Sequence, residues 1–128
     1  MTVTPIYAGL LALLYVALAA QVIRYRRRNR VSLGDGGQKE LAQLVRAHGN
    51  CAEYGTLGIV LLALVELQGT APALAVHGLG CMLLVGRILH GYAFSRFPMV
   101  MGLRVPGMAL TLFMIVFSAL ALLAGALI

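Results

Sequence analysis

The sequence predicts an all-α polytopic membrane protein, a bundle of four transmembrane helices built as one domain over residues 1–128. Two observations predict this class. Of the residues, 61% are hydrophobic and 11% are charged, whereas a soluble domain is about 45–50% apolar and about 25% charged. The apolar residues also form four stretches long enough to cross a hydrocarbon core of about 30 Å. A small soluble domain cannot bury so much apolar surface, and disorder requires low hydrophobicity.

The first predicted span, Pro5 to Ile23, contains no charged residue. A secretory signal carries its positive charge before an apolar core of about 7–15 residues. Here the core is longer and the charge follows it, so we expect a retained transmembrane helix. Because lipid offers the backbone no partners outside a helix or a closed barrel, all four spans are expected to be helical.

Five of the ten basic residues follow this span in the run RYRRRNR, residues 24–30. In a soluble protein, such a run and a net charge of +6 would raise the question of nucleic acid. Directly after an apolar span, the run is typical of the positive-inside rule and of contact with anionic lipid. We therefore expect a lipid bilayer around the chain and no nucleic-acid partner. Three glycines in VSLGDGGQ, residues 31–38, predict a loop.

The remaining spans are predicted over Leu41–Leu67, over about Ala73–Phe94 and over Val105–Ile128. Pro72 ends the turn GTAP, where it suits the start of the third helix. The first and third loops hold nearly all the basic residues, and the second loop holds none. By the positive-inside rule, we expect loops one and three in the cytoplasm and both termini outside.

One face of the second span gives the strongest functional signal. A charged side chain at mid-bilayer costs about 2.5–3.5 kcal/mol, so Arg46 and Glu53 need a reason to be there. At about 100° per residue, Asn50 and Glu53 lie within about 40° of Arg46. Tyr54 lies about 80° round the helix, whereas His48 points elsewhere.

Two interpretations of this polar face stay open on spacing alone. Arg46 and Glu53 are about 10 Å apart along the axis, too far for an ordinary i,i+4 pair, although long side chains can meet beside Asn50. The face is then a structural contact between helices. In the other interpretation it binds a ligand that carries both charges, because a guanidinium binds a carboxylate in bidentate fashion and Glu53 can hold an ammonium group.

The same stretch, RAHGNCAEY at residues 46–54, resembles the second-helix motif of the MAPEG family, the membrane-associated proteins of eicosanoid and glutathione metabolism. The resemblance extends over almost the whole chain and includes the arginine-rich first loop and GRILH at residues 86–90. The segment LRVPGMALT, residues 103–111, is most similar to the bacterial branch. The resemblance implies a homotrimer in the bacterial inner membrane, with glutathione as co-substrate between subunits. The three histidines and two cysteines have no metal-ligand spacing, and no metal is expected.

The resemblance also implies residue roles. The arginine that stabilises the glutathione thiolate in the family corresponds to Arg104, the expected catalytic residue. In the first loop Arg26, Arg27 and Arg30 line up with the family, and Arg27 is the preferred contact. The expected glutathione-binding residues are Arg27, Arg30, Arg46, His48, Asn50, Glu53, Tyr54 and Tyr92.

The third span departs from the family pattern. Many members have a tyrosine four residues beyond the histidine, where this chain has Phe94. Tyr92 provides that contact only under a shifted alignment, and it lies about 160° from Phe94 round the helix. Arg87 and His90 have two open interpretations, a ligand contact or a structural pair between helices.

Taken together, these residues favour a membrane-embedded glutathione transferase or peroxidase that acts on lipophilic electrophiles. A non-catalytic family member that binds or presents lipid is the alternative. A small multidrug exporter is disfavoured, because Arg46 shares a face with Glu53 and would repel cationic drugs.

Overall fold

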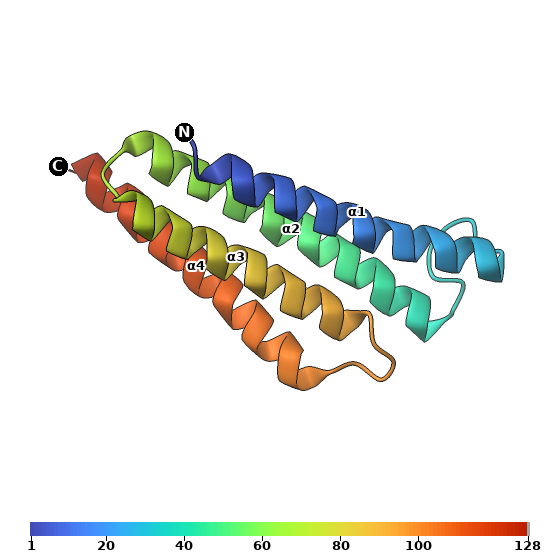
Figure 1. The fold of residues 1–128 in the computed structure, drawn as a ribbon. Coiled ribbons are helices and arrows are strands. Elements are labelled where there is room, and N and C mark those ends of the chain that lie inside the picture. The colour runs from blue at the N-terminus through green and yellow to red at the C-terminus, as the bar shows by residue number, and fades with distance from the viewer. Residues whose placement is uncertain (128) are drawn as a thin grey trace.

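The computed structural model describes residues 1–127 as a bundle of four helices (Figure 1). They are α1 (Thr4–Asn29), α2 (Lys39–Gln68), α3 (Ala73–Phe94) and α4 (Met101–Leu127). Each contains an 18-residue stretch with a mean hydropathy of 1.4 or more, and each is long and apolar enough to cross a membrane. The predicted four-helix membrane fold is confirmed.

α1 and α4 are longer than the spans predicted from hydropathy. α1 does not end at Ile23 but continues through the basic run to Asn29. Arginine is a good helix former, and its charge is stabilised near a helix C-terminus. α4 begins at Met101, before the predicted start at Val105. Ile128, which ended the predicted fourth span, lies outside the described residues.

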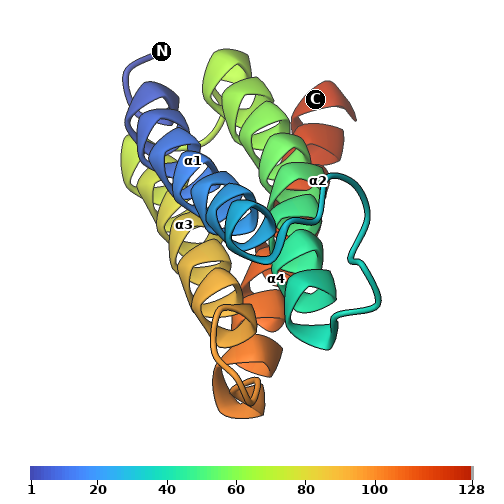
Figure 2. The same ribbon diagram turned by 90° about the vertical axis from the view of Figure 1, so that its right-hand side faces the viewer.

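The helices alternate in direction, so that both termini lie at one end of the bundle together with the α2–α3 turn (Figure 1). The α1–α2 and α3–α4 loops lie at the opposite end, which Figure 2 also shows. Loops one and three therefore share an end, here called the basic end because of the arginine run at residues 24–30. Its placement in the cytoplasm stays a prediction.

α3 and α4 pack at backbone contact through two glycines. A Cβ added to Gly86 would lie 2.8 Å from the carbonyl oxygen of Gly107. A Cβ added to Gly107 would lie 2.7 Å from the backbone nitrogen of His90. Small residues at a membrane helix interface permit such close approach, and here they bring His90 and Phe94 of α3 beside the first turns of α4.

Glu66 joins α2 to the start of α1 at the end that carries the termini. Its carboxylate accepts hydrogen bonds from the backbone N–H groups of Thr2, Val3 and Thr4 at 2.5, 2.8 and 2.7 Å. Amides at a helix start have no partner within the helix, and a carboxylate there also interacts favourably with the helix dipole. Glu66 thereby fixes the chain's first residues to α2.

At the basic end, Gln43 of α2 holds the α3–α4 loop. Its side-chain amide donates hydrogen bonds to the carbonyl oxygens of Phe94 and Arg96, each at 2.8 Å. The Ser95 hydroxyl also donates to Oε1 of Gln21 in α1 at 2.8 Å. These bonds position the loop that leads into α4 and Arg104.

Candidate functional site

A cavity of about 600 Å³ lies between α2, α3 and α4 towards the basic end. Polar side chains from three helices line it beside an apolar wall from α4. The lining includes Arg46, Asn50, His90, Phe94, Met101 and Arg104. The fold thus brings Arg104 into the same cavity as Arg46 and Asn50 of the second-helix motif.

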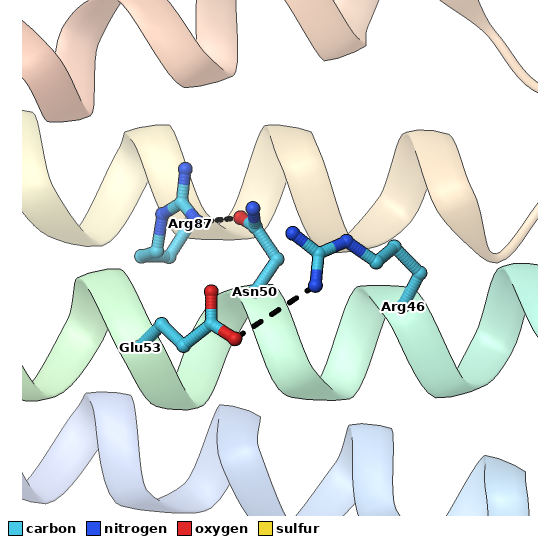
Figure 3. Close-up of polar contacts among 4 residues, drawn as sticks. All are labelled: Arg46, Asn50, Glu53 and Arg87. Carbon is cyan, nitrogen blue, oxygen red and sulfur yellow. Dashed lines mark hydrogen bonds and ion pairs between the residues drawn. The ribbon is translucent and has the colours of Figure 1, made fainter.

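Arg87 is a buried centre of hydrogen bonds among α2, α3 and α4, with 1% of its surface exposed. Its Nε donates to Oγ1 of Thr111 at 3.0 Å, and its Nη1 donates to Oδ1 of Asn50 (Figure 3). Its Nη2 lies 3.5 Å from Sδ of Met108, and its guanidinium carbon lies 5.6 Å from the centre of the Tyr54 ring. These contacts favour the structural interpretation of Arg87.

Arg46 and Glu53 meet on the outer face of α2. Their side chains point toward each other (Figure 3), and Nη1 of Arg46 lies 3.8 Å from Oε1 of Glu53. The side chains are 58% and 62% exposed. A charge-assisted hydrogen bond is about 2.7–2.9 Å long, so this is a loose ion pair. Two charged groups in such a pair are available to bind a ligand or a neighbouring subunit.

Arg104 reaches into the cavity with weak partners. Its guanidinium carbon lies 5.0 Å from the centre of the Phe94 ring. Its Nη1 lies 3.6 Å from Sδ of Met99 and 3.9 Å from Sδ of Met101. A thioether is a weak acceptor, and within residues 1–127 no carboxylate pairs with Arg104. The guanidinium therefore retains most of its capacity to bind an anion.

Phe94 and Tyr92 occupy different sides of α3. Phe94 is buried and stacks on His90 with 4.5 Å between the ring centres. Tyr92 is 47% exposed, and the guanidinium carbon of Arg96 lies 4.8 Å from the centre of its ring. Within one chain, Phe94 and His90 line the cavity and Tyr92 does not.

The remaining candidates lie away from this cavity in the single chain. His48 packs on Tyr15 of α1, with 4.5 Å between ring centres, on a different side of α2 from the Arg46–Glu53 pair. Arg27 and Arg30 line a separate cavity of about 450 Å³ at the end of α1. Within one chain, none of these three side chains lines the main cavity.

Sequence reasoning missed two contributors to the site. Thr111 and Met108 of α4 contact Arg87. Both lie in the segment at residues 103–111, whose family resemblance does not indicate this contact. Gln43 and Glu66 were also missed, because their partners are more than fifty residues away along the chain.

A sequence profile described as the MAPEG family matches residues 4–124, nearly the full chain. The chain belongs to the MAPEG family. It is also similar to "Inner membrane protein YecN" of Escherichia coli, in strain K12 and in strain O6:H1 (CFT073). Each is 43% identical over 94 residues, which cover 73% of this chain and 71% of the relative. The predicted family and its bacterial branch are confirmed, while the relatives' name states a location and no activity.

Proposed function

We propose that this MAPEG protein is a glutathione-dependent transferase or peroxidase of the bacterial inner membrane, acting on lipophilic electrophiles as a homotrimer. The observation that carries the proposal is that Arg46 and Arg104 line one cavity, while the ion-pair partner of Arg46, Glu53, lies on the neighbouring outer face of α2. A loose, exposed pair of opposite charges, Arg46 and Glu53, adjoins a cavity that Arg104 enters with only thioether and aromatic neighbours.

The charged groups of glutathione match those of the α2 face. The tripeptide carries two carboxylates and one ammonium group. Arg46 binds a carboxylate in bidentate fashion, Glu53 binds the ammonium group, and the ligand replaces their 3.8 Å contact with two shorter ones. Because Oδ1 of Asn50 already accepts from Arg87, the Asn50 NH₂ group remains as a donor to a ligand carbonyl. Tyr54 lies on the same side of the helix.

Arg104 supplies the activation step. A free thiol has a pKa near 8.5 and is only a few per cent ionised at neutral pH. Lowering that pKa by about two units requires about 2.7 kcal/mol of preference for the thiolate. A guanidinium hydrogen-bonded to sulfur at a water-poor site can provide this preference. Arg104 has no competing carboxylate within residues 1–127.

The thiolate then performs one of two reactions. With an electrophilic carbon, sulfur forms the C–S bond as the leaving group departs with the bonding electrons. With a hydroperoxide, sulfur takes the distal oxygen, a proton completes the alcohol product, and a second glutathione converts the sulfenic acid to the disulfide and water. In both reactions the protein binds glutathione and stabilises its thiolate, and no metal is required.

The homotrimer completes the site. Charged side chains facing lipid are costly, and Arg46 and Glu53 are more than half exposed in the single chain. A neighbouring subunit that covers them would also bring Arg27, Arg30 and His48 towards the ligand. We expect native mass measurement in mild detergent to find trimers, and a population of monomers alone would contradict the assembly.

The decisive experiment adds glutathione to the purified protein and records thiolate ultraviolet absorbance. An enzyme of this kind develops the thiolate band at neutral pH and turns over a model electrophile. A lipid-presenting family member shows neither. A cation exporter would instead show proton-driven uptake in vesicles, with no thiolate band.

A further inference from the structure

The arginine run at the end of α1 divides between two sides of the helix. Three of its residues, Arg26, Arg27 and Arg30, line the 450 Å³ cavity described above. Arg24 and Arg28 instead line a separate groove of about 300 Å³ between α1, α2 and the α3–α4 loop. The proposed function uses only the first set, and the groove of Arg24 and Arg28 has no role in it.

The two groove arginines lack acidic partners. Nε of Arg24 donates only to the carbonyl oxygen of Ala20 in its own helix, at 3.4 Å. Within residues 1–127 no carboxylate oxygen lies within 4.0 Å of either guanidinium. The nearby Glu40 instead accepts a hydrogen bond from the Tyr25 hydroxyl at 2.9 Å. Since like charges four residues apart on a helix repel each other, the pair favours an anion between them.

The rest of the lining suits a phosphate group with an attached chain. Oε1 of Gln21 accepts a hydrogen bond from the Ser95 hydroxyl at 2.8 Å. The NH₂ group of Gln21 therefore remains as a donor beside the arginines. Phe97, 44% exposed, adds an aromatic wall. The groove thus offers hydrogen-bond donors to a phosphate group and apolar surface to the chain attached to that phosphate.

Its position along α1 coincides with the membrane surface. The charge-free stretch Pro5–Ile23 ends directly before Arg24, and nineteen helical residues span about 28 Å, close to the hydrocarbon thickness of about 30 Å. Arg24 therefore lies at the hydrocarbon boundary and Arg28 one turn farther out, at the depth of phospholipid headgroups. Tyr25, which also lines the groove, has the amphipathic ring that is enriched at the same level.

We propose that this groove is a binding site for an anionic phospholipid, with the phosphate held between Arg24 and Arg28. A lipid with an uncharged alcohol headgroup, such as phosphatidylglycerol, fits this lining. A zwitterionic headgroup fits less well, because its ammonium group would lie beside two guanidinium groups.

The absence of tryptophan from the sequence allows a clean test. Phe97→Trp places a single reporter in the groove wall of the full-length protein, reconstituted in phosphatidylcholine. Brominated phosphatidylglycerol or brominated phosphatidylcholine is then titrated in, and the quenching of tryptophan fluorescence gives the relative affinity of each lipid. We expect a clear preference for phosphatidylglycerol, and no preference would overturn the proposal.

Charge-matched variants in the same background separate a site from general surface attraction. Arg24→Gln and Arg28→Gln are each expected to reduce the preference about fivefold. Lys39→Gln removes one charge at the same end of the bundle from a residue outside the groove, and should change the preference less than twofold. An equal loss from Lys39→Gln would mean that no specific site exists. Inorganic phosphate at millimolar concentration should not relieve the quenching, and relief would assign the groove to a soluble anion instead.

Discussion

Arg87 and Arg46 lie on either side of Asn50 (Figure 3), yet their surroundings differ in kind. Arg87 is 1% exposed and donates hydrogen bonds to side chains of α2 and α4. Arg46 is 58% exposed and has one ion pair at 3.8 Å. A buried charge is costly unless it is hydrogen-bonded, and the guanidinium of Arg87 has two oxygen acceptors and a thioether around it. In the described part of the chain, Arg46 has no hydrogen bond to another helix and is exposed, so its guanidinium is the one of the two that can bind a ligand.

Asn50 contacts the buried arginine and also lines the cavity. Its oxygen is bonded to the structural arginine, while the residue lines the open cavity next to Arg46. One amide thus joins the rigid contact among α2, α3 and α4 to the expected ligand site. Changes at Arg87 should therefore alter stability first, and changes at Arg46 and Glu53 should alter binding first.

The largest effect is expected from Arg87→Leu. It leaves Asn50 and Thr111 without their buried donor. Since an unsatisfied buried polar group costs about 1–3 kcal/mol, we expect a loss of about 2–4 kcal/mol in the free energy of unfolding. Denaturation in mixed micelles measures this loss. Arg46→Leu is the control, because Arg46 is exposed and loses only one loose ion pair at 3.8 Å, so we expect a smaller loss of stability. Equal losses from the two variants would remove the distinction between the buried and the open arginine.

The next effect concerns binding. Glu53→Ala removes the acceptor for the ammonium group of glutathione, and a hydrogen-bonded charge contributes about 1.5–3 kcal/mol with further loss from the unpaired partner. We expect binding to become undetectable by calorimetry while the unfolding midpoint changes little. Unaltered glutathione affinity in this variant would mean that the Arg46–Glu53 pair is structural after all.

The positions of these residues can be predicted from sequence where they depend on one helix alone. They cannot where they depend on how several helices pack. Helical periodicity alone puts Arg46, Asn50 and Glu53 on one face of α2. The same periodicity predicts that His48 points away from that face, which agrees with its contact to Tyr15 of α1. The approximate limits of all four helices follow equally well from hydropathy, since each helix spans the bilayer by its own composition. Such features need no knowledge of packing.

Contacts between helices were not predictable in the same way. Arg87 bonds to Thr111 because Gly86 and Gly107 let α3 and α4 touch, which fixes a rotation that no single-helix pattern contains. Glu66 meets Thr4 across 62 residues. Sequence placed Phe94 and Tyr92 on different sides of α3, but packing decides which one faces the cavity.

A third prediction separates binding from activation at Arg104. Arg104→Ala should keep glutathione affinity within several-fold, because Arg46, Asn50 and Glu53 still hold the tripeptide. The thiolate ultraviolet band and most turnover should disappear with the loss of about 2.7 kcal/mol of anion stabilisation. A variant that keeps its thiolate band would transfer the role to Arg27. Loss of binding together with the band would show that one residue performs both tasks.

The smallest effect on glutathione binding is expected at His48. Its side chain points away from the polar face of α2, and its ring packs on Tyr15. If glutathione lies between subunits, we expect His48 to make at most one hydrogen bond to it. We therefore expect His48→Ala to weaken binding by a few-fold, since a typical net hydrogen bond contributes about 0.5–1.5 kcal/mol. Calorimetry on His48→Ala and Glu53→Ala under the same conditions checks this. A loss as large as that of Glu53→Ala would place His48 inside the site, and the face that carries Arg46 and Glu53 would no longer define it alone.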